Sequence, residues 1–258
     1  MERITSPDGT TVSFNKVGKG PALVLVHGAF SDHHTNWEFV KPILQDRFTL
    51  YAIARRGRGD TDATEGHSLV DEANDLVTLI RAIAEPVFLL GHSYGGHCSL
   101  AAALVAPDRI RKLALYEPAW PTIFSNDGWA RLERLATAHK WDEFAVTFFR
   151  DTLFVPSEEI DQLRATELWP PIVADAVASL GDLRALKSYE FQPQRYRQLG
   201  IPVLLQIGSE SRRDLYVTDA LMAVLPDVRI GELSGQAHEG MTTAPEMYAD
   251  AVIRFFLE

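Results

Sequence analysis

Short apolar runs alternate with longer helical patterns along most of the chain. The first part of the chain predicts strands at TVSFNKV (11–17), ALVLV (22–26), FTLYAIA (48–54) and VFLL (87–90). Between the last two runs, apolar residues recur at helical spacing from Leu69 to Ile83, and Ser68 before them is a favoured N-cap residue. Strand-helix-strand units of this kind build a mostly parallel sheet. The run at 87–90 is uniformly apolar, which is typical of a central strand buried on both faces.

The second half of the chain contains a long interval without strand signals. Further strands are predicted at LALY (113–116), PVLLQI (202–207) and VRIGEL (228–233), followed by a helix from about 245 to 256. Residues 119–199 contain no convincing strand, yet they hold four of the five tryptophans and show helical periodicity. The pattern therefore predicts an α/β core of residues 1–118 and 200–258, and a helical insertion at 119–199 over the carboxyl edge of the sheet.

The sequence GHSYGG (91–96) places a serine between glycines, directly after a strand and before an Ala-rich helix. Gly-X-Ser-X-Gly in this setting is typical of a nucleophile elbow, a turn so tight that side chains on the glycines would collide with backbone. The helix that follows directs a partial positive charge toward the serine. Ser93 is therefore the predicted nucleophile, whereas the alternative is a glycine-rich turn with a hydrogen-bonding serine.

A serine hydroxyl needs a base within hydrogen-bond reach and a carboxylate that orients the base. Among the eight histidines, His238 lies in the predicted loop between the last strand and the last helix, where its imidazole can reach over the carboxyl edge of the sheet. It is the predicted base. His27 and His92 precede Gly28 and Ser93 in tight turns and are interpreted as structural.

These motifs together resemble the serine type of the α/β-hydrolase superfamily with a helical cap. VLVHGAF (24–30) resembles the oxyanion loop of that family, RRGRGD (55–60) its following turn, and QAHEG (236–240) its histidine loop. The resemblance covers nearly the whole chain and implies the α/β-hydrolase fold, a mostly parallel sheet with helices on both faces. It also implies an oxyanion hole formed by the backbone amides of Ala29 and Tyr94, and removal of such a donor typically costs about 3 kcal/mol.

The chain departs from the family pattern at the triad acid. After the penultimate strand the family normally has Gly-X-X-Asp, but GSES (208–211) puts Ser211 in that place. Glu117, at the end of the strand 113–116, needs a partner to offset its desolvation, and His238 would be one. Alternatively Glu117 pairs with an arginine of the insertion, and either Glu210 or Asp214 is the acid. Glu117 is preferred, Glu210 is second and Asp214 is third.

Composition and charge narrow the range of partners and compartments. The formal net charge of −10 disfavours nucleic acid and anionic membranes as partners. The arginines of RRGRGD are interpreted as a solvated or salt-bridged loop. Cys98 is the only cysteine, which excludes an intrachain disulfide and fits a reducing compartment, and the N-terminal residues lack a signal-peptide pattern. We expect a cytoplasmic monomer or homodimer with a small-molecule substrate, no metal and no cofactor.

The predicted reaction is hydrolysis of a small, largely apolar carboxylic ester or lactone through an acyl-enzyme. A serine nucleophile argues against epoxide and haloalkane hydrolysis, which in this superfamily use aspartate. Carbon-carbon bond hydrolysis, perhydrolysis, a lyase reaction and a non-catalytic small-molecule receptor remain alternatives. Four aromatic residues are candidates for the substrate pocket, although each has packing as its alternative role: Phe30, Trp120, Phe124 and Trp169.

Overall fold

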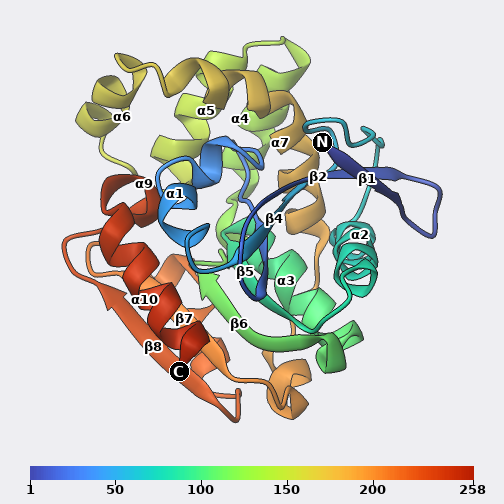
Figure 1. Ribbon diagram of the computed structural model, residues 1–258. Helices are drawn as coiled ribbons and strands as arrows, with labels where there is room; N and C mark the ends of the chain where they lie inside the picture. Colours follow the sequence, from blue (N-terminus) through green and yellow to red (C-terminus); the bar gives the residue numbers. More distant parts are fainter.

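The computed structural model describes residues 1–258 and contains one eight-stranded sheet (Figure 1). The strand order is β1-β2-β4-β3-β5-β6-β7-β8. Strands β3 to β8 are parallel to one another, whereas β2 pairs antiparallel with both β4 and the edge strand β1. The bounds are β1 (Glu2–Thr5), β2 (Thr11–Gly18), β3 (Ala22–Val26), β4 (Thr49–Ala54), β5 (Val87–His92), β6 (Ile110–Tyr116), β7 (Val203–Gly208) and β8 (Val228–Leu233). The predicted mostly parallel sheet is confirmed.

Ten α-helices surround the sheet, and none of them is both long and apolar enough to cross a bilayer. The core contains α1 (Lys41–Leu44), α2 (Leu69–Ala82), α3 (Tyr94–Val105), α8 (Thr218–Met222), α9 (Gly240–Thr243) and α10 (Pro245–Leu257). Helix α2 begins at Ser68 with a capping box. The Asp71 N–H donates to Ser68 Oγ at 3.3 Å, and the Ser68 N–H donates to the Asp71 carboxylate at 2.7 Å.

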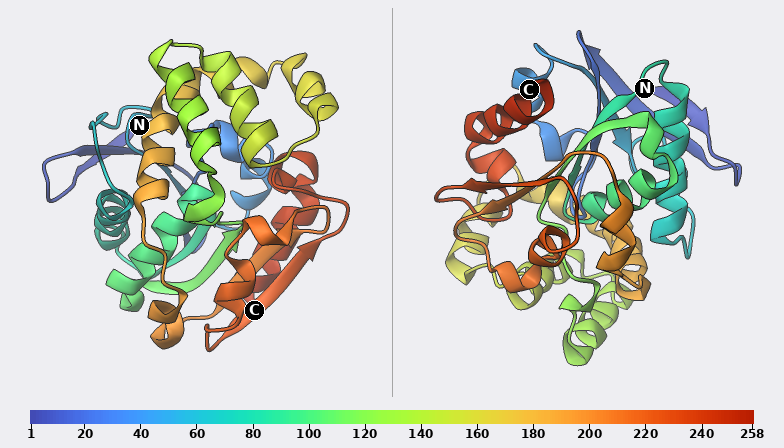
Figure 2. Two further views of the ribbon diagram at one scale, coloured as in Figure 1. Left: turned by 180° about the vertical axis from the view of Figure 1, so that it is seen from behind. Right: turned by 90° about the horizontal axis from the view of Figure 1, so that it is seen from below.

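The sheet separates two apolar cores, because successive side chains of each strand point to opposite faces. In β5 all six residues are buried. Leu89 packs in the core under α2 and α3, whereas Phe88 and Leu90 pack in the core under α1 and α10. Figure 2 (right) shows these two helix pairs on opposite sides of the sheet. Burial on both faces explains why β5 has an uninterrupted apolar sequence, as predicted for a central strand.

Residues 119–199, which we call the cap segment, lie between β6 and β7 and contain no strand. Their α-helices gather at one end of the molecule in Figure 1: α4 (Asn126–Thr137), α5 (Trp141–Thr147), α6 (Ser157–Arg164) and α7 (Trp169–Ser188). The segment has its own apolar cluster, which includes Leu132, Phe144 and Leu183. Phe30, from the loop after β3, inserts into this cluster, and its ring centroid lies 4.7 Å from that of Phe148. Phe30 thus joins the core to the cap segment.

Candidate active site

Ser93 lies in the turn between β5 and α3 with φ 51° and ψ −120°, a conformation that is uncommon for a residue with a side chain. The Ser93 N–H donates to the Tyr116 carbonyl at 2.8 Å, and the Gly96 N–H donates to the Ser93 carbonyl at 2.9 Å. Three of the five non-glycine residues with left-handed φ lie around this point: Phe30, Ser93 and Glu117. Backbone strain of this kind gathers at functional sites, where the surrounding structure holds it in place.

The glycines around Ser93 are required by close backbone approach. A Cβ atom on Gly95 would lie 2.3 Å from the Val26 carbonyl oxygen and 2.4 Å from that of His27. A Cβ atom on Gly91 would lie 2.5 Å from Ser99 Oγ. Because β3 is a central strand, its carbonyls cannot move away, and the elbow packs against the end of β3 only with glycine at position 95.

Gly95→Ala is expected to destabilise the fold by about 1–3 kcal/mol or more, because the new methyl group overpacks against fixed backbone. Gly200→Ala is the matched control, since a Cβ atom there meets no atom within 4 Å and should change stability by less than about 1 kcal/mol. Urea unfolding of both variants measures the difference. Equal midpoints for Gly95→Ala and wild type would contradict the steric account.

His238 and Glu117 form a hydrogen-bonded pair beneath the cap segment. His238, in the loop after β8, has its Nδ1 atom 2.8 Å from Glu117 Oε2. Glu117 follows β6 and is fully buried, and its Oε1 atom accepts a 2.8 Å hydrogen bond from the Gly208 N–H at the end of β7. The carboxylate thus fixes Nδ1 as the protonated nitrogen and leaves Nε2 free to accept a proton.

Glu117 also sets the proton affinity of His238. Burial by itself lowers the pKa of this imidazole, but the hydrogen bond and the negative charge of Glu117 outweigh burial and raise the pKa above its usual 6.5. The Tyr216 ring stacks on the imidazole, with centroids 5.3 Å apart and an interplanar angle of 14°. The ring plane of His238 is therefore held by packing as well as by the carboxylate.

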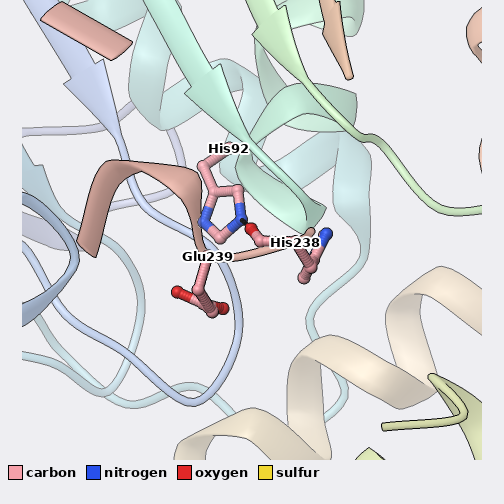
Figure 3. A group of neighbouring side chains, drawn as sticks. All are labelled: His92, His238 and Glu239. Atoms are coloured by element: carbon pink, nitrogen blue, oxygen red, sulfur yellow. Dashed lines mark hydrogen bonds between the residues drawn. The ribbon is translucent and has the colours of Figure 1, made fainter. Parts of the chain in front are cut away.

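Two buried side chains hold the backbone of the histidine loop. His92, at the end of β5, has Nε2 3.2 Å from the His238 carbonyl oxygen and Nδ1 2.9 Å from Asn36 Oδ1. The Tyr116 hydroxyl donates to the Ala237 carbonyl. Figure 3 shows His92 beside His238 and Glu239. These three residues bring candidate metal ligands together, but both nitrogens of His92 and Nδ1 of His238 are already engaged in hydrogen bonds.

Ser93 and His238 line one cavity together with Ala29 and Tyr94. The Ser93 hydroxyl makes no hydrogen bond to the imidazole in this structure, and such contacts commonly tighten only when substrate is bound. The Ala29 N–H has no acceptor within the protein. Tyr94 is the first residue of α3, so its N–H has no acceptor within the helix. Two free backbone donors therefore border the cavity that contains the serine.

The structure brings only one of the three candidate carboxylates to His238. Glu210 is exposed, and its carboxylate accepts a hydrogen bond from Ser209 Oγ at 3.1 Å. Asp214 is also exposed and pairs with Arg212 at 2.7 Å. Glu210 and Asp214 therefore do not lie where a triad acid is expected, because their carboxylates bond to Ser209 and Arg212 and not to His238. The end of β7 contributes the Gly208 amide, which holds Glu117 in place, and the next two residues, Ser209 and Glu210, are exposed.

Eleven of the fifteen residues that line the cavity are hydrophobic. Phe30 and Phe124 line it, but Trp120 and Trp169 do not. Trp169 is buried behind the lining, where its Nε1 donates to Asp142 at 2.7 Å, and Trp120 packs edge-on against Phe191. The structure thus places both tryptophan rings outside the cavity lining, where they pack against other residues of the cap segment.

Several lining residues of the cap segment were not among the predicted pocket residues. They lie on the π-helical turn η4 (Phe148–Thr152), just after it and on α7: Phe148, Phe149, Leu153, Leu183 and Leu186. The sequence carries a signal for them, since the apolar residues near 148 recur at helical spacing. Which of them face the cavity depends on how the cap helices pack on the core.

Comparisons with known proteins identify the family of this chain. A model of the alpha/beta hydrolase family matches residues 23–251. The 2-(acetamidomethylene)succinate hydrolase of Mesorhizobium japonicum is 28% identical, over 95% of this chain and 91% of that protein. An alpha/beta hydrolase from Sphaerobacter thermophilus has a TM-score of 0.85 at 29% identity, covering 99% of this chain and 100% of that one. The enol-lactonase from Burkholderia xenovorans has a TM-score of 0.82 at 19% identity, covering 100% of both chains, and so shares the fold. The chain therefore belongs to the alpha/beta hydrolase family.

Proposed function

We propose that this protein is a serine hydrolase that cleaves a small, uncharged and largely apolar carboxylic ester or lactone. The observation that carries the proposal is the hydrogen bond between His238 and the buried carboxylate of Glu117, in a cavity that Ser93 also lines. Ser93, His238 and Glu117 thus have the roles of nucleophile, base and acid. The apolar lining of the cavity supports the choice of an apolar substrate.

In the first half of the reaction, His238 Nε2 takes the proton of the Ser93 hydroxyl as its oxygen attacks the carbonyl carbon. The carbonyl oxygen becomes an oxyanion, which the N–H groups of Ala29 and Tyr94 bind. When the tetrahedral intermediate collapses, the bond to the leaving oxygen breaks, and that oxygen takes the proton from the imidazolium. The products of this half are the free alcohol and an ester of Ser93 with the acyl group.

In the second half, water enters in place of the alcohol and gives a proton to His238 as it attacks the acyl-Ser93 carbonyl. The same two amides bind the second oxyanion. Collapse returns the proton to the Ser93 oxygen and releases the carboxylic acid. The sum is one ester and one water converted to one acid and one alcohol. A lactone gives a single hydroxy acid, because its alcohol remains attached to the acyl group.

The charge of the cavity supports an uncharged substrate. Among its lining residues there is no lysine or arginine, and the only carboxylate is that of Glu239, next to His238. The relative from Mesorhizobium japonicum is named for a succinate, a compound with two carboxylates. A carboxylate entering the cavity of this chain would lose its hydration without gaining a cation as partner. We therefore propose a substrate that differs in charge from the one in that relative's name.

The experiment compares ethyl butyrate with monoethyl succinate, which differ by a methyl group in place of a carboxylate. Ethyl butyrate is expected to have a kcat/KM at least about tenfold higher, because desolvation of the carboxylate and repulsion by Glu239 both oppose binding of the succinate. Release of acid and ethanol is followed by NMR. Glu239→Gln should reduce the ratio of kcat/KM between ethyl butyrate and monoethyl succinate, but ethyl butyrate should remain the better substrate.

A preference for monoethyl succinate would overturn the proposed substrate charge. If neither these esters nor any lactone or thioester is turned over, hydrolysis itself is excluded, and a small-molecule receptor becomes the better explanation. Ethyl butyrate thus tests the reaction, and the ratio between the two esters tests the substrate class.

A further inference from the structure

A buried network of hydrogen bonds connects the loop after β3 with helix α7 of the cap segment. Its centre is Arg55, which follows β4 and is only 4% exposed. Arg55 Nε donates to the His27 carbonyl at 2.9 Å, and Nη2 donates to the Gly28 carbonyl at 2.8 Å. One guanidinium thus holds two successive carbonyls immediately before Ala29.

The contact with Gly28 fixes the direction of an amide that the proposed mechanism uses. The C=O of Gly28 and the N–H of Ala29 belong to one peptide group, which is planar and trans, so they point in opposite directions. As long as Arg55 holds the Gly28 carbonyl, the Ala29 N–H is directed away from the guanidinium. Rotation of this peptide would break the hydrogen bond with Arg55 and move the amide at the same time.

Helix α7 holds Arg55 in place. Asp182 is fully buried and accepts two hydrogen bonds from Arg55, from Nη1 to Oδ1 at 2.9 Å and from Nη2 to Oδ2 at 2.7 Å. Such bidentate contacts fix both the position and the plane of a guanidinium. Glu72 of α2 accepts a further bond from Nη1 at 2.8 Å. The arginines of RRGRGD are therefore salt-bridged and buried, not solvated.

Helix α7 also contacts the loop directly, one turn before Asp182. Ser179 is fully buried, and its Oγ accepts a 2.7 Å hydrogen bond from the Phe30 N–H while donating to Asp175 at 2.8 Å. Phe30 has a left-handed φ of 57°, which is unfavourable for a residue with a side chain and needs such support. Ala29 is thus flanked by two peptide groups, one held through Arg55 and the other by Ser179.

The second proposed oxyanion donor touches the same network. The guanidinium of Arg55 lies over the Tyr94 ring, 4.6 Å from its centroid, and the Tyr94 hydroxyl donates to Glu72 at 3.2 Å. Arg55 therefore contacts both the Gly28 carbonyl, next to Ala29, and the Tyr94 ring. Asp182 and Ser179 of the cap segment hold this network in place.

We infer that Ser179 and Asp182 of α7 are positioning residues for the oxyanion hole: Ser179 acts on the Phe30 peptide and Asp182 acts through Arg55 on the Gly28–Ala29 peptide. This inference rests on the proposed function, because it assigns a role in the same reaction. Its consequence is that the cap segment determines the rate of the chemical step as well as covering the cavity.

The test uses Ser179→Ala, Ser179→Thr and Asp182→Asn, since removal of Arg55 would leave buried carboxylates unpaired and endanger folding. With 4-nitrophenyl butyrate, Ser179→Ala and Asp182→Asn should each lower kcat by roughly 10- to 100-fold, with less than about threefold change in KM. The affinity for a trifluoromethyl ketone, which binds as an oxyanion, should fall by a similar factor. Ser179→Thr keeps the hydroxyl acceptor and should recover most of kcat.

The matched control is Ser188→Ala on the same helix, where Oγ donates only to the Ala185 carbonyl, and this variant should behave as wild type. If Ser179→Ala and Asp182→Asn keep wild-type kcat and inhibitor affinity, the inference is overturned. A rise in KM with unchanged kcat and inhibitor affinity also overturns it, because that result indicates a change of pocket shape alone. The proposed function is tested separately with Ser93→Ala: if this variant still hydrolyses the ester, Ser93 is not the nucleophile, whatever the Ser179 and Asp182 variants show.

Discussion

Replacement of Ser93 by alanine is expected to lower kcat for 4-nitrophenyl butyrate by about 10⁴- to 10⁶-fold, because no acyl-enzyme can form. KM should stay near the wild-type value, since the rest of the cavity lining is unchanged. Steady-state kinetics measures the rate, and intact-protein mass spectrometry after treatment with a fluorophosphonate measures the nucleophile. Wild type should gain one phosphonyl group on Ser93, and the variant should gain none.

The turn geometry supplies a control for this comparison. Ser93→Ala keeps a Cβ atom at φ 51° and should leave the structure of the elbow unchanged. Any loss of activity is then a loss of the hydroxyl and not of the fold, which thermal melting can check. Hydrolysis that survives in Ser93→Ala at more than a few per cent of the wild-type rate would falsify the covalent mechanism.

Glu117→Gln is expected to lower kcat by roughly 10²- to 10⁴-fold, the range found when the acid of a serine triad is replaced. The glutamine amide removes the charge that stabilises the imidazolium. It also changes the pH dependence. The base acts as neutral imidazole, so kcat/KM rises with pH through the pKa of His238, which Glu117 places above 6.5. Without that carboxylate the pKa of His238 falls, and the acid limb of the profile moves to lower pH.

Glu210→Gln is the control for this prediction. The Glu210 side chain is exposed and its carboxylate hydrogen bonds only with Ser209, so its replacement should leave kcat within about twofold of wild type and the acid limb in place. The reverse outcome, with a large loss in Glu210→Gln and little change in Glu117→Gln, would assign the triad acid to the loop after β7.

The central strands were predictable because a parallel strand that is buried on both faces needs an almost uninterrupted apolar sequence. VFLL and PVLLQI lie within β5 and β7, whose residues are all buried, or extend them by a residue. VRIGEL coincides with β8, which is an edge strand with only one buried residue and does not share this burial. Strand β1 (Glu2–Thr5) was not predicted. Its sequence is short and polar, and it forms only because β2 offers an edge for pairing. Tertiary pairing of this kind leaves no periodic signal in a four-residue segment.

The candidate site was predictable where it depends on chain position relative to a strand. Ser93 and Glu117 directly follow strands, and carboxyl ends of neighbouring parallel strands meet at one edge of a sheet. For RRGRGD the interpretation as a salt-bridged loop was confirmed, but the burial of its arginines was not predicted. Arginines in loops are mostly solvent-exposed. The burial of Arg55 and Arg58 depends on Asp182, which follows both by more than a hundred residues, whereas Arg56 pairs with Asp75. Charge pairing across such separations has no local pattern.

The order of the strands has a consequence for how this protein becomes active during synthesis. Glu117 and His238 hydrogen bond across 121 residues, and Phe30 and Ser179 across 149. Contacts of such separation form late, since the entropy of closing the loops opposes them. A nascent chain whose residues beyond 237 are still inside the ribosome can fold strands and even the elbow, yet it has no base. Hydrolytic activity would thus emerge only after His238 has left the ribosome, so its onset could time the assembly of the site.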